Sequence, residues 1–224
     1  MTVRISLDFE TLSPKENAVL LSLGACVFDP ATGEIGAQFY AAIDPRTQPG
    51  RDINPDTVLW WMQQDQAARD KITQAVKSAD LLDSIDDTTP EDEAENIFAT
   101  AAHPIQNVAR AFLLFVEELG ESVECWTNGA VDHAWLESMF QYSGFKNPIK
   151  FWMQRDYRTL KALYPDVKAE DYGVAHNALD DAIKQAKHLV AIMQHTDDIR
   201  ADAGLDRQYV VSPVANLLDD DLLF

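Results

Sequence analysis

The chain has 224 residues, of which 46% are hydrophobic and 9% aromatic. This is enough apolar material for the core of one sizeable α/β domain, and it excludes a disordered chain. No apolar run approaches the roughly 20 residues that cross a bilayer, and the chain opens on a strand pattern without the apolar segment of a signal peptide. We therefore expect a globular protein of the cytoplasm with no membrane partner.

The acidic balance of the chain, 37 acidic against 18 basic residues, argues at first against a partner made of phosphates. The charge is unevenly distributed, however. Eight acids lie between Asp80 and Glu95, in a stretch without Lys or Arg that we expect to form a solvated insertion at about residues 78–104. Between Phe145 and Lys168 the basic residues outnumber the acids; they are Lys146, Lys150, Arg155, Arg158, Lys161 and Lys168. A local basic rim is therefore compatible with the overall charge.

Three strand patterns open the chain: VRISLDF, AVLLSLGACVFD and AQFYAAID. The second and third are separated by DPATGE, whose Pro and Gly suit a hairpin turn, so we expect three antiparallel strands. Cys26 lies in one of these apolar runs and Cys125 in a later one, without the close spacing of a metal knuckle or a redox pair. Both are therefore expected to be buried thiols.

Helical and strand patterns alternate in the rest of the chain. INPDTVLWWMQQ begins with Asn54 as an N-cap and Pro55 at the first helical position, and QAARDKITQAV continues as a second short helix. The later patterns, in chain order, are a helix in NVARAFLLFVEEL, a buried strand in ESVECWTNG, a helix in VDHAWLESMFQYS ended by Gly144, a short strand and helix in KFWMQRDYRTLKALYP, and a long helix in ALDDAIKQAKHLVAIMQ. The order predicts one α/β domain over residues 1–200, with a mixed sheet flanked by helices, and a tail at 201–224.

Asp8 and Glu10 form the first of three acidic clusters. They alternate across the end of the first strand, so both side chains project from the same face, about 7 Å apart along the backbone. Two carboxylates on one face can share a hard cation. The alternative is an ordinary solvated strand end, which is common in so acidic a chain.

Asp132 belongs to the second cluster, NGAVDH, which follows a predicted buried strand. That strand ends at Asn128, and side chains at the carboxyl ends of neighbouring parallel strands converge on a crevice. The alternative is that Asp132 caps its helix. His133, beside it, is expected to be a surface or packing residue.

The third cluster is HNALDDA, at the start of the long C-terminal helix. Asn177 followed three residues later by Asp180 resembles a capping box, which gives Asp180 a structural role toward the free backbone amides. Asp181 lies about 100° further round the helix and is left free for another role. His176 precedes the cap in an extended segment and is expected to lean over the same point.

Together, DFET, NGAVD and HNALDD resemble the three exonuclease motifs of the DEDDh exonucleases, the DnaQ-like group with a ribonuclease-H-like fold. The resemblance extends from Ile5 to about Met193, and it implies a five-stranded mixed sheet, three antiparallel strands followed by parallel ones. Adjacent tryptophans in the helix after the third strand, together with KFWMQRDYRT, look most like the phage exonuclease A type, which implies a bacterial or phage-encoded protein.

The resemblance implies that Asp8, Glu10, Asp132 and Asp181 are metal-binding carboxylates and that His176 is the general base. The step of five residues from the histidine selects Asp181 over Asp180, in agreement with the capping argument. The implied cofactors are two Mg²⁺ or Mn²⁺ ions, and the implied activity is 3′-5′ exonucleolytic release of nucleoside monophosphates from nucleic acid with a free 3′ end. DNA is the favoured substrate. The alternatives are an exoribonuclease of the same fold and a non-catalytic acidic DNA mimic.

The residues expected to contact the substrate lie near these motifs. They are Thr11, Leu12, Trp60, Trp61, Asn128, Arg155 and Arg158. Many members of the family carry a glycine after DFET where this chain has Leu12 and Ser13, which implies different contacts to the terminal nucleotide. Trp60 and Trp61 are adjacent on a helix, so only one of them can face the cleft. The tail NLLDDDLLF can dock in a protein partner, or it can pack back on the domain or fray.

Overall fold

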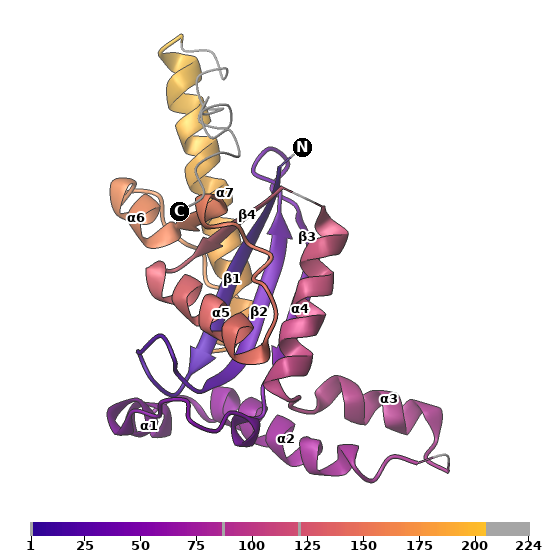
Figure 1. Cartoon of the computed structure of the whole chain (residues 1–224). Coiled ribbons are helices and arrows are strands. Elements are labelled where there is room, and N and C mark those ends of the chain that lie inside the picture. The colour runs from indigo at the N-terminus through magenta and orange to yellow at the C-terminus, as the bar shows by residue number, and fades with distance from the viewer. Residues whose placement is uncertain (1, 87, 121, 205–224) are drawn as a thin grey trace, which may run out of the picture.

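A five-stranded sheet forms the centre of the computed structural model, which describes residues 2–86, 88–120 and 122–204 (Figure 1). Its strands, in the spatial order β3-β2-β1-β4-β5, are β1 (Val3–Thr11), β2 (Leu20–Phe28), β3 (Ile35–Ala42), β4 (Val123–Thr127) and β5 (Gln154–Asp156). The first three pair antiparallel, and β4 and β5 continue the sheet parallel to β1. This arrangement confirms the predicted mixed sheet.

Helices surround the sheet, and two of them begin or end at the residues that the sequence predicted. Asn54 caps α1 (Pro55–Met62) by accepting from the backbone amides of Asp56 and Thr57. Gly144, with a φ of 74°, ends α5 (Ala130–Ser143). No helix of the described ranges is long and apolar enough to cross a membrane. The helices are α1 (Pro55–Met62), α2 (Gln66–Leu82), α3 (Glu91–Thr100), α4 (Ile105–Leu119), α5 (Ala130–Ser143), α6 (Tyr157–Leu163) and α7 (Ala178–Asp202), with short 3-10 turns η1 (Pro45–Thr47) and η2 (Phe151–Met153).

The core has one layer on each face of the sheet, because successive strand residues point to opposite faces. Cys125 lies in the larger layer, where the sheet packs against α4 and α5 through Phe112 and Phe140. Cys26 lies in the opposite layer, where the sheet packs against α6 and α7 through Tyr157 and Leu189. Both cysteines are buried free thiols, as predicted.

The acidic stretch forms regular structure that the sequence analysis did not predict. Helix α2 is longer than the expected short helix, and α3 occupies the second part of the stretch. The two helices lie beside each other at one end of the molecule (Figure 1). Three acids in the first turn of α3 suit the positive end of its dipole, and Ala75 of α2 packs on Ala42 and Ala102. Helix α7 also continues into the predicted tail, and residues 205–224 lie outside the described part of the chain.

Gly24 brings the first turn of α7 against the sheet. A Cβ atom at this position would lie 2.2 Å from the backbone carbon of Ala178 and 2.2 Å from the backbone nitrogen of Leu179, so only glycine allows this approach. Gly24 pairs with Asp8 across β2 and β1. The start of α7 is therefore held beside the strand position that carries Asp8.

Candidate active site

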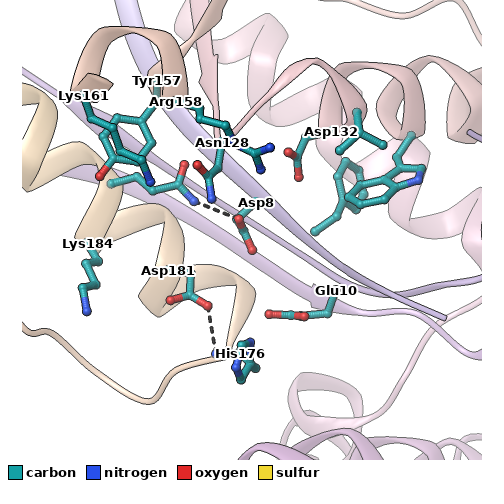
Figure 2. Close-up of a pocket in the computed structure, with 14 residues that line it drawn as sticks. Asp8, Glu10, Asn128, Asp132, Tyr157, Arg158, Lys161, His176, Asp181 and Lys184 are labelled. Carbon is teal, nitrogen blue, oxygen red and sulfur yellow. Dashed lines mark hydrogen bonds between the residues drawn. The ribbon is translucent and has the colours of Figure 1, made fainter. Parts of the chain in front are cut away.

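The three acidic clusters meet in one cavity of about 410 Å³ at the carboxyl ends of β1 and β4 (Figure 2). Asp8 and Glu10 come from β1, Asp132 from the first turn of α5, and Asp181 from the first turn of α7. His176 lies in the segment that leads into α7. The cavity is lined by Asp8, Phe9, Glu10, Asn128, Val131, Asp132, Trp135, Tyr157, Arg158, Lys161, His176, Asp181, Lys184 and Gln185.

One side of the cavity has the geometry of a metal site. Glu10, His176 and Asp181 each offer one ligand atom, and these three atoms all lie within 4.8 Å of one another. Carboxylate oxygens are the preferred ligands of Mg²⁺ and Mn²⁺. Asp8 lies between this group and Asp132 (Figure 2). The carboxylates of Glu10, Asp181 and Asp8 therefore offer the oxygen donors that such cations prefer, with the imidazole of His176 beside them.

The electrostatics of the four acids also fit a cation site. Burial raises the pKa of Asp8 well above its ordinary value, and the charges of Asp132, Glu10 and Asp181 raise it further. Burial and the nearby acids raise the pKa of Glu10 to about 8. Burial also raises the pKa of Asp132 to about 7, although backbone hydrogen bonds and Arg158 oppose this shift. A divalent cation favours the ionised form of each carboxylate and relieves their mutual repulsion.

The turn before α7 differs from the predicted capping box. Asn177 accepts from the amide of Leu179, as a cap does, at 3.2 Å. Asp180, however, accepts from the amide of Val174 at 2.9 Å, because the Asn177 amide already donates to the Val174 carbonyl. Asp180 is structural, but it closes the preceding loop and forms no reciprocal box.

His176 does not have the extended conformation that the sequence predicted. Its φ is 64°, in the left-handed region, where a non-glycine residue costs on the order of 1–3 kcal/mol. Its backbone amide donates to Oδ2 of Asp181 at 2.8 Å, which holds the strained turn (Figure 2). Asp181 is therefore not free of local contacts. It fixes the backbone of His176 while it faces the cavity.

The two adjacent tryptophans have separate positions. Trp61 is 7% exposed, and its Nε1 donates to the carbonyl of Thr11 at 2.9 Å. Trp60 is 42% exposed, and its ring meets the ring of His176 edge to face at 4.8 Å between centroids. The pair therefore links the end of β1 to the His176 turn, with Trp60 as the accessible member.

Asn128 and Arg158 line the cavity on the side of Asp132 (Figure 2). The other predicted arginine does not. Arg155 donates to the carbonyls of Trp152 and Gln154, and its Nε lies 3.7 Å from a Glu124 oxygen.

His133 is a buried packing residue whose Nε2 lies 3.1 Å from the Arg155 carbonyl, and burial lowers its pKa. Asp156 caps α6 by accepting from the amide of Thr159.

Thr11 and Leu12 lie behind the cavity wall and do not line it. Thr11 is buried and donates to the carbonyl of Ser13. Leu12 packs against the cluster of Leu21, Trp61 and Ala68. They support the end of β1 and the buried Trp61, and neither is among the residues that line the cavity.

Gln185 is a site residue that the sequence analysis missed. It is buried, and its Nε2 donates to Oδ1 of Asp8 at 2.8 Å. It lies four residues after Asp181, on the same face of α7. The helical repeat from Asp181 could therefore have identified Gln185 as a residue of the site. Tyr157, Lys161 and Lys184 also line the cavity without having been assigned to the substrate.

Comparison with known proteins gives one family match. The family described as the 3′-5′ exoribonuclease Rv2179c-like domain matches residues 3–193. No curated protein has a significantly similar sequence.

Solved exonuclease structures share the fold. The 3′-exonuclease seen in 3′-end-specific recognition of a histone mRNA stem-loop matches with a TM-score of 0.53 and 16% identity, over 86% of this chain and 82% of that chain. The zinc-bound form of E. coli exonuclease I with single-stranded DNA matches with a TM-score of 0.54 and 11% identity, over 91% of this chain and 42% of that chain. At these identities the likeness shows the fold.

The predicted resemblance to DEDDh exonucleases is confirmed, whereas the phage exonuclease A type is not confirmed by these matches. The convergence of the three motifs on one cavity agrees with the family match, which extends over most of the chain. The chain belongs to the family of the Rv2179c-like 3′-5′ exoribonuclease domain and is a 3′-5′ exonuclease.

Proposed function

We propose that the protein releases nucleoside monophosphates one at a time from the free 3′ end of RNA, with two divalent cations, Mg²⁺ or Mn²⁺. The observation that carries the proposal is the convergence of four carboxylates and one imidazole, from three separate segments of the chain, on one cavity (Figure 2). The residues assigned to the cations are Asp8, Glu10, Asp132 and Asp181.

Asp8 would contribute to both cation positions, because its charge interacts with all three of the other acids. Glu10 and Asp181 would hold the cation that activates the attacking water, because their oxygens lie within 4.8 Å of each other and of a ring nitrogen of His176. Asp132, on the far side of Asp8, supports the second position directly or through water.

Two bound divalent cations would activate water and would neutralise charge on the entering and leaving oxygens of the phosphodiester. The chain supplies the proton acceptor. His176 is assigned this role, since imidazole is the commonest general base and His176 lies beside the Glu10 and Asp181 oxygens. The strained backbone of His176, its hydrogen bond to Asp181 and the ring of Trp60 hold the imidazole in place.

The strongly acidic chain does not prevent binding of a polyanion. The buried acids of the site are neutralised by the cations that they bind, so the phosphate meets a local positive field. Arg158, Lys161 and Lys184 line the same cavity and are assigned to phosphate contacts. Arg155 is not assigned to the substrate, because its guanidinium already contacts the Trp152 carbonyl and the Glu124 carboxylate.

RNA is the substrate to test first, because the matching family is described as exoribonucleases, although the sequence motifs alone favoured DNA. A non-catalytic DNA mimic fits less well, since mimicry needs exposed carboxylates and Glu10 and Asp132 are buried. A protein partner for the C-terminal tail stays a prediction, because residues 205–224 lie outside the described part of the chain.

The test uses RNA and DNA of one sequence, labelled at the 5′ end and incubated with Mg²⁺. Wild type should give a ladder that shortens from the 3′ end by single nucleotides, faster on RNA, and EDTA should stop it. Asp8→Ala and His176→Ala should each lose at least about 100-fold in rate. The exposed control Glu16→Gln should retain full activity. Equal activity in all four proteins would contradict the proposed site.

A further inference from the structure

Two aromatic side chains stand exposed on η2, outside the active-site cavity. Phe151 is 74% exposed and Trp152 is 50% exposed. Their rings meet edge to face, with 4.9 Å between centroids. Neighbouring aromatics that are this exposed leave much of their ring surface to solvent, and such surfaces commonly mark an interaction site.

The sequence around this aromatic pair is basic. From Lys146 to Lys161 the chain has five basic residues and a single acid, Asp156, in a protein of net charge -19. Asp156 is occupied as the cap of α6. The Nζ atom of Lys150 lies 5.4 Å from the centre of the Trp152 ring. Open aromatic faces beside lysines fit a chain of bases and phosphates better than an uncharged apolar partner.

The aromatic pair is joined to the active site by a short, ordered segment. Residues after η2 form β5 and then enter α6, where Tyr157 and Arg158 line the cavity. Arg155 donates to the carbonyl of Trp152 at 2.7 Å, which ties η2 to β5. Arg158 is the sixth residue after Trp152, so the chain places their Cα atoms at most about 20 Å apart. A few nucleotides of single strand can cover that distance, within the roughly 4–16 nucleotides that such surfaces bind.

We propose that Phe151 and Trp152, together with Lys146 and Lys150, bind the single-stranded part of the substrate upstream of the nucleotide that is cleaved. This inference rests on the proposed function, because it concerns the same substrate. Bases stack on the two aromatic rings whatever their sequence, and the lysines contact the phosphates between them. Substrates too short to reach η2 gain no affinity from this surface.

The test compares a dinucleotide with an oligonucleotide of roughly 12 nucleotides, since only the longer one reaches η2. The double variant Phe151→Ala, Trp152→Ala should hydrolyse the dinucleotide at the wild-type rate. For the longer substrate its KM should rise about tenfold or more, with kcat unchanged. Trp152→Phe, which keeps an aromatic ring, should restore most of the affinity. Phe98→Ala, at a 63% exposed aromatic on α3, is the matched control and should change neither substrate.

A binding measurement separates this inference from the proposed activity. In an Asp8→Ala background with EDTA, fluorescence anisotropy with the labelled longer strand reports affinity whether or not the chain cleaves it. The double variant should bind about tenfold more weakly there too. An unchanged affinity for the longer strand, or an equal loss for the dinucleotide, would overturn the proposed surface. A variant that altered only self-association would identify the pair as a protein interface and would also overturn it.

Discussion

The side-chain amide of Gln185 donates a 2.8 Å hydrogen bond to Oδ1 of Asp8. An ionised carboxylate accepts hydrogen bonds only, so Gln185 must present its NH₂ group to Asp8 and turn its oxygen away. The contact fixes the orientation of the carboxylate at the centre of the four acids. It also joins α7 to β1 one turn beyond Asp181.

Replacing Gln185 should weaken metal binding without unfolding the protein. We expect Gln185→Leu to lower Mn²⁺ affinity and kcat by about 10–100-fold, the usual effect of losing a hydrogen bond to a metal ligand. The KM for nucleic acid should stay unchanged. Titration calorimetry with Mn²⁺ and steady-state hydrolysis measure these quantities. Gln194→Leu, which removes a second glutamine of α7 that contacts the Pro30 carbonyl, is the control. Identical losses in the two variants would refute this role.

Glu10 should destabilise the metal-free protein at alkaline pH. Its pKa is raised from about 4.5 in the unfolded chain to about 8 in the fold. Between these values the native state binds more protons than the unfolded state, so the free energy of unfolding falls as the pH rises. With EDTA at pH near 8, we expect Glu10→Gln to be more stable than wild type by roughly 1–3 kcal/mol. Urea unfolding at pH near 5 and near 8 measures this difference, and added Mg²⁺ should favour wild type again. A less stable variant at the higher pH would be evidence against the shift.

Replacing Trp61 should mainly reduce stability, whereas replacing Trp60 should mainly reduce activity. Trp61→Ala removes a buried side chain and should lower the free energy of unfolding by about 3–5 kcal/mol. Trp60→Ala should cost under about 1 kcal/mol in stability, because its ring is partly exposed. It should still reduce kcat, since the ring of His176 loses its neighbour. Urea unfolding and single-turnover hydrolysis test both expectations, and the reverse pattern would show that the tryptophans were assigned the wrong way round.

Gly24→Ala should damage both stability and activity. The added Cβ meets the backbone of α7 at 2.2 Å, so the helix that holds Asp181 must move away from Asp8. We expect a loss of at least about 1–3 kcal/mol in the free energy of unfolding, together with lower kcat. Gly36→Ala on β3 is the control, because its Cβ would meet Val27 at an ordinary 3.4 Å. Equal behaviour of the two variants would contradict the close approach.

The sheet could be predicted from local patterns, whereas the meeting of the three acidic clusters was implied by the resemblance to DEDDh exonucleases. Alternating residues identified β1, and the Asn54 and Gly144 signals marked helix ends. The acidic clusters follow strands or begin helices, where side chains converge. The capping argument and the five-residue step implied by the resemblance both selected Asp181, which the structure brings to the cavity with Glu10 and His176.

What the sequence did not reveal depends on contacts between distant segments. Helix α3 has acidic residues throughout its first turn, and its pairing with α2 is invisible in either segment alone. The left-handed backbone of His176 follows from its hydrogen bond to Asp181 and from the loop that Asp180 closes. The role of Gln185 likewise required knowing that α7 lies across β1.

The most direct test of the account is a count of bound Mn²⁺ ions, by electron paramagnetic resonance titration in the presence of a nucleoside monophosphate. Wild type should bind two ions per chain, and His176→Ala should still bind two, because the histidine is assigned to proton transfer. Asp8→Ala should lose both, since Asp8 is assigned to both positions. A wild-type protein that binds no Mn²⁺, or an Asp8→Ala variant that binds as many ions as wild type, would contradict the assignment of the four carboxylates.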